Sequence, residues 1–161
     1  DNLLMNYAYE IGEILKKKTW KISTTESCTG GLLSSKLTDI SGSSEYITLN
    51  LVTYANEAKH KMLGVKNETL ETFGAVSEEC AYEMAKGLHK LTGSDICVST
   101  TGIAGPTGGS EKKPVGLMYS TIYTKDEFRT YKILMPQTTP RITMKELFAQ
   151  EVLKNIFEFL Q

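Results

Sequence analysis

Three short segments of the sequence gather the residue types that could do chemistry. They are residues 26–31, 54–59 and 101–110, which combine hydroxyl, lysine and glycine residues at the ends of predicted strands. In α/β sheets, ligands gather at the carboxyl ends of strands, where several loops converge. The sequence therefore predicts that the three segments meet at one site.

Ser27 is the candidate nucleophile of the first segment. It lies at a predicted strand-to-helix junction and is closely followed by Gly30 and Gly31. Backbone N–H groups at a helix start are unpaired and carry partial positive charge, so those from Thr29 to Gly31 could hold an oxyanion or a phosphate. A capping hydroxyl residue in a tight turn would explain the same residues without catalysis, and the local sequence alone favours that interpretation.

A nucleophilic serine needs a base, which Lys59 and Tyr54 could supply together. Serine–lysine systems use a lysine whose pKa has been lowered by burial or by a nearby cation. In such a group, the tyrosine relays or orients the proton. The alternative is an edge tyrosine and a solvated lysine, since lysines are usually solvated.

The third segment offers donors that could complete a pocket. Thr101 and the loop Gly102–Gly109, with Gly105 inside it, could shape the place of an oxyanion or a substrate. A glycine-rich turn without a ligand is the alternative.

Arg141 follows Pro140 at the start of the last predicted helix, where the dipole disfavours a cation, so it indicates either an anionic partner or a surface salt bridge.

The histidines and cysteines indicate no metal site. His60 and His89 have no metal-ligand spacing with each other or with the cysteines, and a Ser-His-Asp triad would need one of them to fold back to Ser27. Cys28, with His60 as base, is an alternative nucleophile. A small buried packing residue is the simpler interpretation of Cys28.

The composition describes an ordinary globular domain. The chain has 161 residues, with 40% hydrophobic and 23% charged, which fits a single domain over 1–161. A net charge of -1 argues against a nucleic-acid partner, and no apolar run of about 18 residues could span a membrane. Three cysteines give no disulfide framework, and without a secretory signal the cytosol is the expected compartment.

Helices and strands alternate along most of the chain. Apolar residues at helical spacing, among them Leu4 and Ile11, predict a helix over 2–18. Further helices are predicted over 32–40, 55–63, 78–91 and 140–160, and strands over 20–25, 46–54, 95–101, 115–123 and 128–135. Because the last two strands form a hairpin around 124–126, we expect a three-layer α/β/α sandwich with a mixed β-sheet. The G-x-G-x-x-G pattern is absent after the first strand, so no dinucleotide-binding fold is implied.

Five motifs together make the sequence recognisable. They are Thr25–Gly31, Val52–Lys59, Gly74–Ser77, Gly102–Ser110 and Lys113–Gly116. In this order and spacing they resemble the C-terminal domain of the competence/damage-inducible CinA proteins, a family that also includes stand-alone nicotinamide-nucleotide amidases (PncC). The similarity covers nearly the whole chain.

The resemblance implies an enzyme of pyridine-nucleotide salvage. Members hydrolyse the carboxamide of nicotinamide mononucleotide to nicotinic acid mononucleotide and ammonia, with no metal or redox cofactor. The resemblance also implies a Ser-Tyr-Lys catalytic group, which falls here on Ser27, Tyr54 and Lys59, and a site hydroxyl that falls on Thr101. It further implies a homo-oligomer.

One stretch departs from the family pattern. The family has a Gly-Asp/Asn-Arg stretch before the last helix and a second arginine shortly after it, whereas residues 136–141 here lack the first arginine. Arg141 matches the second, so the phosphate is expected at Arg141 or at a helix N-terminus.

The alternatives to an enzyme are a module that binds a nucleotide without turnover and a regulatory partner in DNA uptake or damage response.

Overall fold

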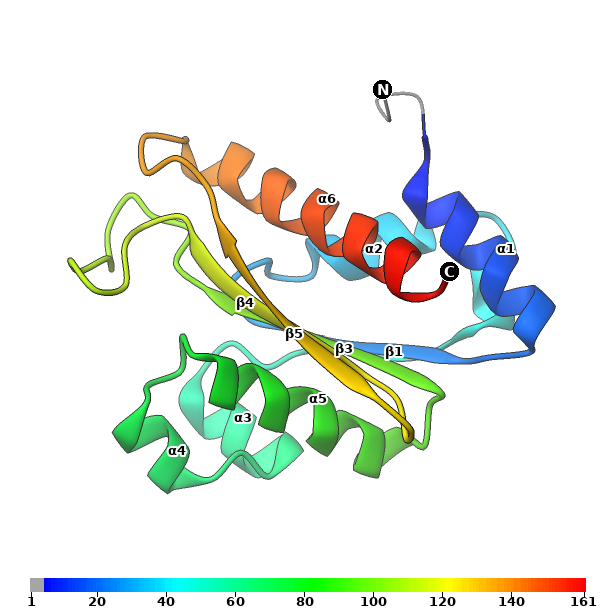
Figure 1. The fold of residues 1–161 in the computed structure, drawn as a ribbon, viewed down its shortest axis with the longest axis horizontal. Coiled ribbons are helices and arrows are strands. Elements are labelled where there is room, and N and C mark those ends of the chain that lie inside the picture. Colours follow the sequence, from blue (N-terminus) through cyan, green and yellow to red (C-terminus); the bar gives the residue numbers. More distant parts are fainter. Residues whose placement is uncertain (1–4) are drawn as a thin grey trace.

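A five-stranded sheet lies between two layers of helices (Figure 1). The structure is a computed structural model that describes residues 5–161. One layer holds α1 (Tyr7–Lys18), α2 (Leu32–Thr38) and α6 (Arg141–Phe159), and the other holds α3 (Asn56–Leu63), α4 (Asn67–Thr72) and α5 (Glu78–Thr92). The predicted three-layer α/β/α sandwich is confirmed.

The sheet is mixed, with strand order β2-β1-β3-β4-β5. Its strands are β1 (Ile22–Glu26), β2 (Ile47–Val52), β3 (Ile96–Gly102), β4 (Leu117–Tyr123) and β5 (Phe128–Leu134). Strand β1 runs parallel to β2 and β3, while β4 is antiparallel to β3 and β5. The carboxyl ends of β1, β2 and β3 therefore lie at the same edge of the sheet.

Apolar side chains fill both interfaces between the sheet and the helices. The larger cluster includes Ile11, Leu33 and Phe148 from α1, α2 and α6, and the smaller one includes Met84 and Leu88 from α5. The longer helices α1, α5 and α6 each bury an apolar face within these clusters, which is the main stabilising contribution in a domain of this kind.

The interior strand β1 is buried at every position although most of its residues are polar. Its hydroxyls find partners across the sheet and its flanks: Ser23 bonds to Ser94 and Thr25 bonds to Thr53, each at 2.8 Å. Buried polar groups are tolerated when they are hydrogen-bonded. This strand therefore places hydrogen-bonded hydroxyl groups in the interior of the fold.

The first helix is shorter than the sequence predicted. It begins at Tyr7 because the side chain of Asn6 accepts a hydrogen bond from the N–H of Tyr9 at 3.1 Å and caps the helix. Residues 2–4 of the predicted helix, Leu4 among them, lie outside the described residues. The short helix α4 and the 3₁₀ turn η1 (Ser43–Glu45) were not predicted.

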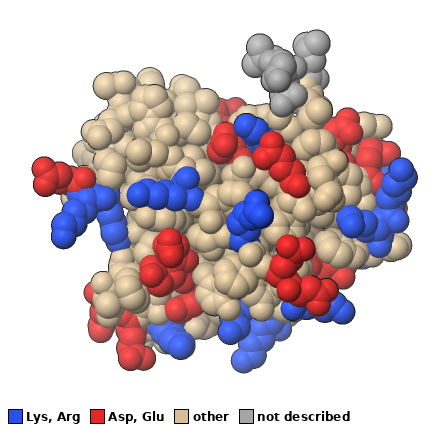
Figure 2. All heavy atoms as spheres, viewed as in Figure 1, with Lys and Arg blue, Asp and Glu red and all other residues tan. Residues whose placement is uncertain are grey.

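The surface carries both signs of charge. Acidic and basic side chains are interspersed over the face drawn in Figure 2, without a continuous basic field. Among the helices of residues 5–161, none is long and apolar enough to cross a membrane.

Candidate active site

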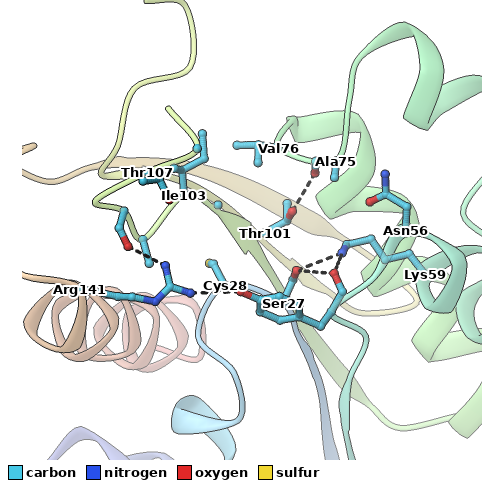
Figure 3. A pocket seen from close by; sticks show the side chains of 15 residues that line it. Ser27, Cys28, Asn56, Lys59, Ala75, Val76, Thr101, Ile103, Thr107 and Arg141 are labelled. Atoms are coloured by element: carbon cyan, nitrogen blue, oxygen red, sulfur yellow. Dashed lines mark hydrogen bonds between the residues drawn. The ribbon is translucent and has the colours of Figure 1, made fainter. Parts of the chain in front are cut away.

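A pocket of about 270 Å³ opens at the sheet edge where β1, β2 and β3 end (Figure 3). Residues of all three predicted segments line it, together with the start of α6. The predicted site residues among them are Ser27, Tyr54, Lys59, Thr101, Gly102, Gly105 and Arg141. The structure thus brings segments together that are far apart in the sequence.

Ser27 directly follows the last residue of β1. Its N–H donates to the carbonyl and the side-chain oxygen of Thr100, at 3.1 and 3.2 Å, which ties it to the neighbouring strand β3. Its Oγ lies 3.0 Å from Nζ of Lys59 and 3.4 Å from the carbonyl oxygen of Tyr54. The serine hydroxyl is therefore held between an amine and a carbonyl.

Lys59 is buried, with 1% of its surface exposed. It lies on α3 and its amine donates to Ser27 Oγ and, at 2.8 Å, to the carbonyl of Tyr54. Burial lowers the pKa of the Lys59 amine below its ordinary value. No carboxylate lies within 4.0 Å of this amine in the described part of the chain. No ion pair with a carboxylate therefore stabilises the charged form of Lys59 in this part of the chain.

Tyr54 contacts its neighbours with two different groups. Its backbone carbonyl accepts from Lys59, whereas its hydroxyl accepts from Nη2 of Arg141 at 3.2 Å. The side chain is 57% exposed and lies along the mouth of the pocket. The hydroxyl that was expected to relay a proton is directed to Arg141.

Arg141 is the first residue of α6 and joins that helix to the pocket. Its Nη1 donates to the carbonyl of Gly105 at 2.6 Å, while its Nη2 reaches Tyr54. The guanidinium therefore bridges the loop after β3 and the segment after β2, as Figure 3 shows.

Thr101 faces the pocket from the end of β3. It is 1% exposed, and its hydroxyl donates to the carbonyl of Ala75 at 2.7 Å. Lys113 donates similarly to the carbonyl of Phe73. These two bonds hold the loop between α4 and α5 against the end of β3 and the loop that follows it, so Thr101 helps to build the wall of the pocket.

Thr29, Gly30 and Gly31 do not line the pocket. The N–H of Gly30 donates to the carbonyl of Ser27 at 3.0 Å, and that of Gly31 donates to the Glu26 carboxylate at 3.1 Å. The Thr29 hydroxyl is fully buried and also donates to Glu26. The N–H groups of Gly30 and Gly31 and the hydroxyl of Thr29 therefore have partners within the protein.

Glu26 is a residue whose role the sequence did not reveal. Its carboxylate is completely buried and accepts from the N–H groups of Gly31, Leu33 and Ser34, at 3.1, 3.0 and 2.8 Å. It therefore occupies the N-terminus of α2 as a built-in anion and fixes the turn that contains Ser27. The position of a glutamate at the end of a buried strand is the signal that could have indicated this role.

Asn56 also lines the pocket and was named only as part of a motif. It is the first residue of α3, three positions before Lys59, so the two side chains lie on the same side of the helix. In Figure 3 its carboxamide points from α3 into the pocket.

The structure offers little support for Cys28 as the nucleophile. Its thiol lines the pocket, but burial raises its pKa to about 12, so it stays protonated at neutral pH. The expected base, His60, has its Nδ1 2.7 Å from the carbonyl oxygen of Val65. Within residues 5–161, no group of three or more His, Cys, Asp or Glu residues could hold a metal ion.

Comparison with known proteins identifies relatives over almost the whole chain. The family model described as "CinA C-terminal domain" matches residues 5–160. A "CinA-like protein" of Chloroherpeton thalassium is 50% identical over 152 residues, which is 93% of this chain and 36% of the relative. A "putative competence-damage inducible protein" of Caldanaerobacter subterraneus subsp. tengcongensis is 46% identical over 147 residues, again 36% of its length. The chain thus spans about a third of these curated relatives.

Solved structures match the fold over nearly the whole chain. The competence/damage inducible protein CihA of Agrobacterium tumefaciens superposes with a TM-score of 0.90 at 36% identity, covering 97% of this chain and 96% of that one. A CinA superfamily protein of Escherichia coli superposes with a TM-score of 0.92 at 28% identity, covering 98% and 91%. The sequence match and the shared fold agree, and this chain belongs to the CinA C-terminal domain family.

Proposed function

We propose that this domain hydrolyses the carboxamide of nicotinamide mononucleotide, giving nicotinic acid mononucleotide and ammonia. The observation that carries the proposal is the 3.0 Å contact between Ser27 Oγ and the buried amine of Lys59. A serine hydroxyl next to a lysine with a lowered pKa is the arrangement of a serine–lysine hydrolase. Family membership and the pocket support a small-molecule substrate.

In the first step, neutral Lys59 accepts the proton of Ser27 while Ser27 Oγ attacks the carboxamide carbon. A neutral amine has two N–H groups and one lone pair. When one N–H donates to the carbonyl of Tyr54, the lone pair can be directed at the Ser27 hydroxyl, whose oxygen lies 3.0 Å from Nζ. This geometry is what general-base catalysis requires of a candidate base.

Donors for the developing oxyanion come from the turn after β3. The N–H of Ile103 donates to the carbonyl of Leu117, which leaves those of Ala104 and Gly105 in the same turn. Both residues line the pocket, so we propose their N–H groups as the oxyanion donors.

Collapse of the tetrahedral intermediate releases ammonia, which leaves with the proton held on Lys59. The acyl-enzyme on Ser27 is then hydrolysed when Lys59, neutral again, takes a proton from water. The acid product leaves and the serine is restored. Every proton in this scheme passes through the Lys59 amine, and neither a metal nor a redox cofactor takes part.

The proposal is tested by incubating the purified protein with nicotinamide mononucleotide and measuring both products. We expect turnover that falls by about 10³-fold or more in Ser27→Ala, since loss of a covalent nucleophile has effects of that order. Ser35→Ala is the matched control because Ser35 lies exposed on α2. Absence of turnover by folded protein would reject the activity, and full turnover in Ser27→Ala would reject the nucleophile.

A further inference from the structure

A second cavity, the α5 groove, opens along α5 where α3 and β4 end. It shares no lining residue with the pocket around Ser27 and is larger, about 550 Å³ against 270 Å³. Its lining comes from α5, from the residues that end and follow α3, and from Tyr123 at the end of β4; α3 and α5 belong to the same layer (Figure 1). Small-molecule sites typically enclose about 300–1,000 Å³, so this groove has room for a ligand of its own.

Aromatic rings form one wall of the α5 groove. The ring centroids of Tyr82 and Tyr123 lie 6.1 Å apart, and those of His89 and Tyr123 lie 5.3 Å apart. Phe128, which is 54% exposed at the start of β5, extends this wall, with its ring centroid 4.7 Å from that of Tyr82. A partly exposed aromatic wall offers flat surface to a planar ring, and nucleic-acid bases of every kind stack on such side chains.

The charges that line the groove favour an anion. Lys66, Lys86 and Lys90 are exposed there, and none of them belongs to an ion pair within residues 5–161. Glu83 is the only carboxylate of the lining, so three positive charges minus one negative charge leave +2 with the histidine neutral. The Glu83 oxygens accept from the N–H of Lys66 and the hydroxyl of Thr69, at 2.9 and 2.6 Å, so the carboxylate is engaged at the start of α4.

Helix stability explains only one of the three lysines. Lys90 lies near the C-terminus of α5, where the helix dipole favours a cation. Lys66 is the N-cap residue of α4, where free N–H groups disfavour a cation. The Lys86 amine lies 5.7 Å from the centroid of the Tyr82 ring, so a positive charge and an aromatic surface are adjacent in the groove.

The groove is held in shape by a backbone contact between two helices. A Cβ atom at Gly87 would lie 1.9 Å from the carbonyl oxygen of Leu63, so α5 and the end of α3 touch directly. Glycine is unfavourable inside a helix, and this close approach accounts for its presence. The Nδ1 of His89 lies 3.0 Å from the carbonyl oxygen of Ser94, which can only accept, so the neutral ring keeps Nε2 as an acceptor for a ligand.

We propose that the α5 groove binds a nucleoside monophosphate, with the base on the aromatic wall and the phosphate among the lysine amines. A phosphate monoester carries a charge of about −1.5 to −2 at neutral pH, which matches the lining charge of +2. This binding site is separate from the pocket around Ser27, and its ligand is not the substrate of the proposed hydrolysis.

The test titrates the purified protein with AMP, adenosine and ribose 5-phosphate in a calorimeter at low salt. We expect AMP to bind, and we expect adenosine and ribose 5-phosphate each to bind about 5-fold or more weakly, because one lacks the phosphate and the other the base. Equal affinity for AMP and either fragment would overturn the proposal, since one half of the groove would then contribute nothing. Absence of AMP binding would overturn it as well.

Two variants place the nucleotide in the groove. Lys86→Glu should weaken AMP binding about 3- to 30-fold, because an attractive charge becomes a repulsive one. Tyr82→Leu should weaken it about 5-fold or more through loss of the stacking surface. Lys17→Glu and Tyr9→Leu are the matched controls, since both residues lie exposed on α1 in the opposite helical layer, and they should leave the affinity unchanged. The exposed position of Lys86 keeps the test valid even where Tyr82→Leu fails to fold.

Arg141→Met separates the groove from the pocket around Ser27, which Arg141 lines. This variant should bind AMP as the unaltered protein does. AMP binding that weakens in Arg141→Met but not in Lys86→Glu would overturn the proposal and place the nucleotide in the other pocket. Turnover is not measured in any of these titrations, so failure of the proposed function would leave the result on the groove intact.

Discussion

At the residue scale, the proposed mechanism depends on the protonation state of Lys59. A lysine amine can accept the proton of Ser27 only in its neutral form. Burial lowers the pKa of Lys59 below its ordinary value of 10.5, so a larger neutral fraction is present at any given pH. The mechanism therefore depends on how the amine is buried as well as on where it lies.

We expect kcat/KM to rise with pH along one ascending limb whose midpoint lies below 10.5, because the neutral amine is the active form. Lys59→Met should remove this limb and lower kcat by roughly 10²- to 10⁴-fold. Lys59→Arg should not restore activity, since a guanidinium stays charged. Rates across the neutral to alkaline range provide the measurement, and Lys61→Met, an exposed lysine on the same helix, is the control. A flat profile would remove Lys59 from the role of base.

The same lowered pKa has a consequence for stability. Between the folded-state pKa and the ordinary value, the unfolded chain binds more protons at Lys59 than the folded protein does. The contribution of Lys59 to the free energy of unfolding therefore rises with pH through that window. Lys59→Met should fold and should lose this part of the pH dependence, which denaturant titrations at several pH values would measure.

Residue types and spacing predicted which residues line the pocket, but they did not predict which contacts these residues make. Ser27, Lys59 and Arg141 were predicted from strand-end positions and motifs, and the structure places all three at the pocket. The use of the Tyr54 carbonyl rather than its hydroxyl was not predictable, because it depends on the rotation of a side chain at the pocket mouth. Similarly, no local pattern tells whether the N–H of Gly31 points to a ligand or to Glu26.

At the scale of elements, α2 is a short helix whose first turn depends on Glu26. Its N-cap is Gly31, which has no side chain, so the carboxylate from the end of β1 accepts the free N–H groups instead. The same contacts close the turn that carries Ser27. The end of β1, Ser27 and the start of α2 are thus connected through the buried side chain of Glu26.

Glu26→Gln should lower the free energy of unfolding by about 1–3 kcal/mol, because the amide nitrogen would face N–H groups that need an acceptor. We also expect reduced kcat, since the turn at Ser27 loses part of its support. Denaturant midpoints and rates are compared with Glu68→Gln, an exposed glutamate on α4. Unchanged stability in Glu26→Gln would show that the carboxylate does not hold the helix.

Hydrophobic periodicity predicted the longer helices because α1, α5 and α6 each bury an apolar face, whereas the strands were predicted from short runs of β-branched and aromatic residues between turn signals. The ends were less accurate: β1 extends to Glu26, and α2 ends at Thr38 rather than residue 40. Helix α4 has six residues, which is too short for a helical period to emerge from the sequence. Contacts made elsewhere in the fold, such as Thr69 with Glu83 at 2.6 Å, hold it in place.

At the scale of the whole molecule, the site is built from all three layers. Ser27 follows a strand of the sheet, Lys59 comes from α3 on one face, and Arg141 comes from α6 on the other face (Figure 1). No single layer holds the site together. The relative positions of the layers, and hence both apolar clusters, set the distances in the pocket.

We therefore expect that heating abolishes activity in the same transition that unfolds the chain. The two clusters both include buried residues of β3, namely Ile96 and Val98 in the larger and Cys97 in the smaller, so neither helical layer should unfold alone, and a single domain over 1–161 should show one cooperative transition. Calorimetry should give an enthalpy of roughly 110 kcal/mol near 60 °C, from about 0.7 kcal/mol per residue, equal to the van't Hoff value. Far-UV circular dichroism, the fluorescence of Trp20 beside α1 and the rate of ammonia release should share one midpoint. An earlier loss of activity, with Trp20 unchanged, would mean that the layer of α3 and α5 opens independently and carries Lys59 away from Ser27.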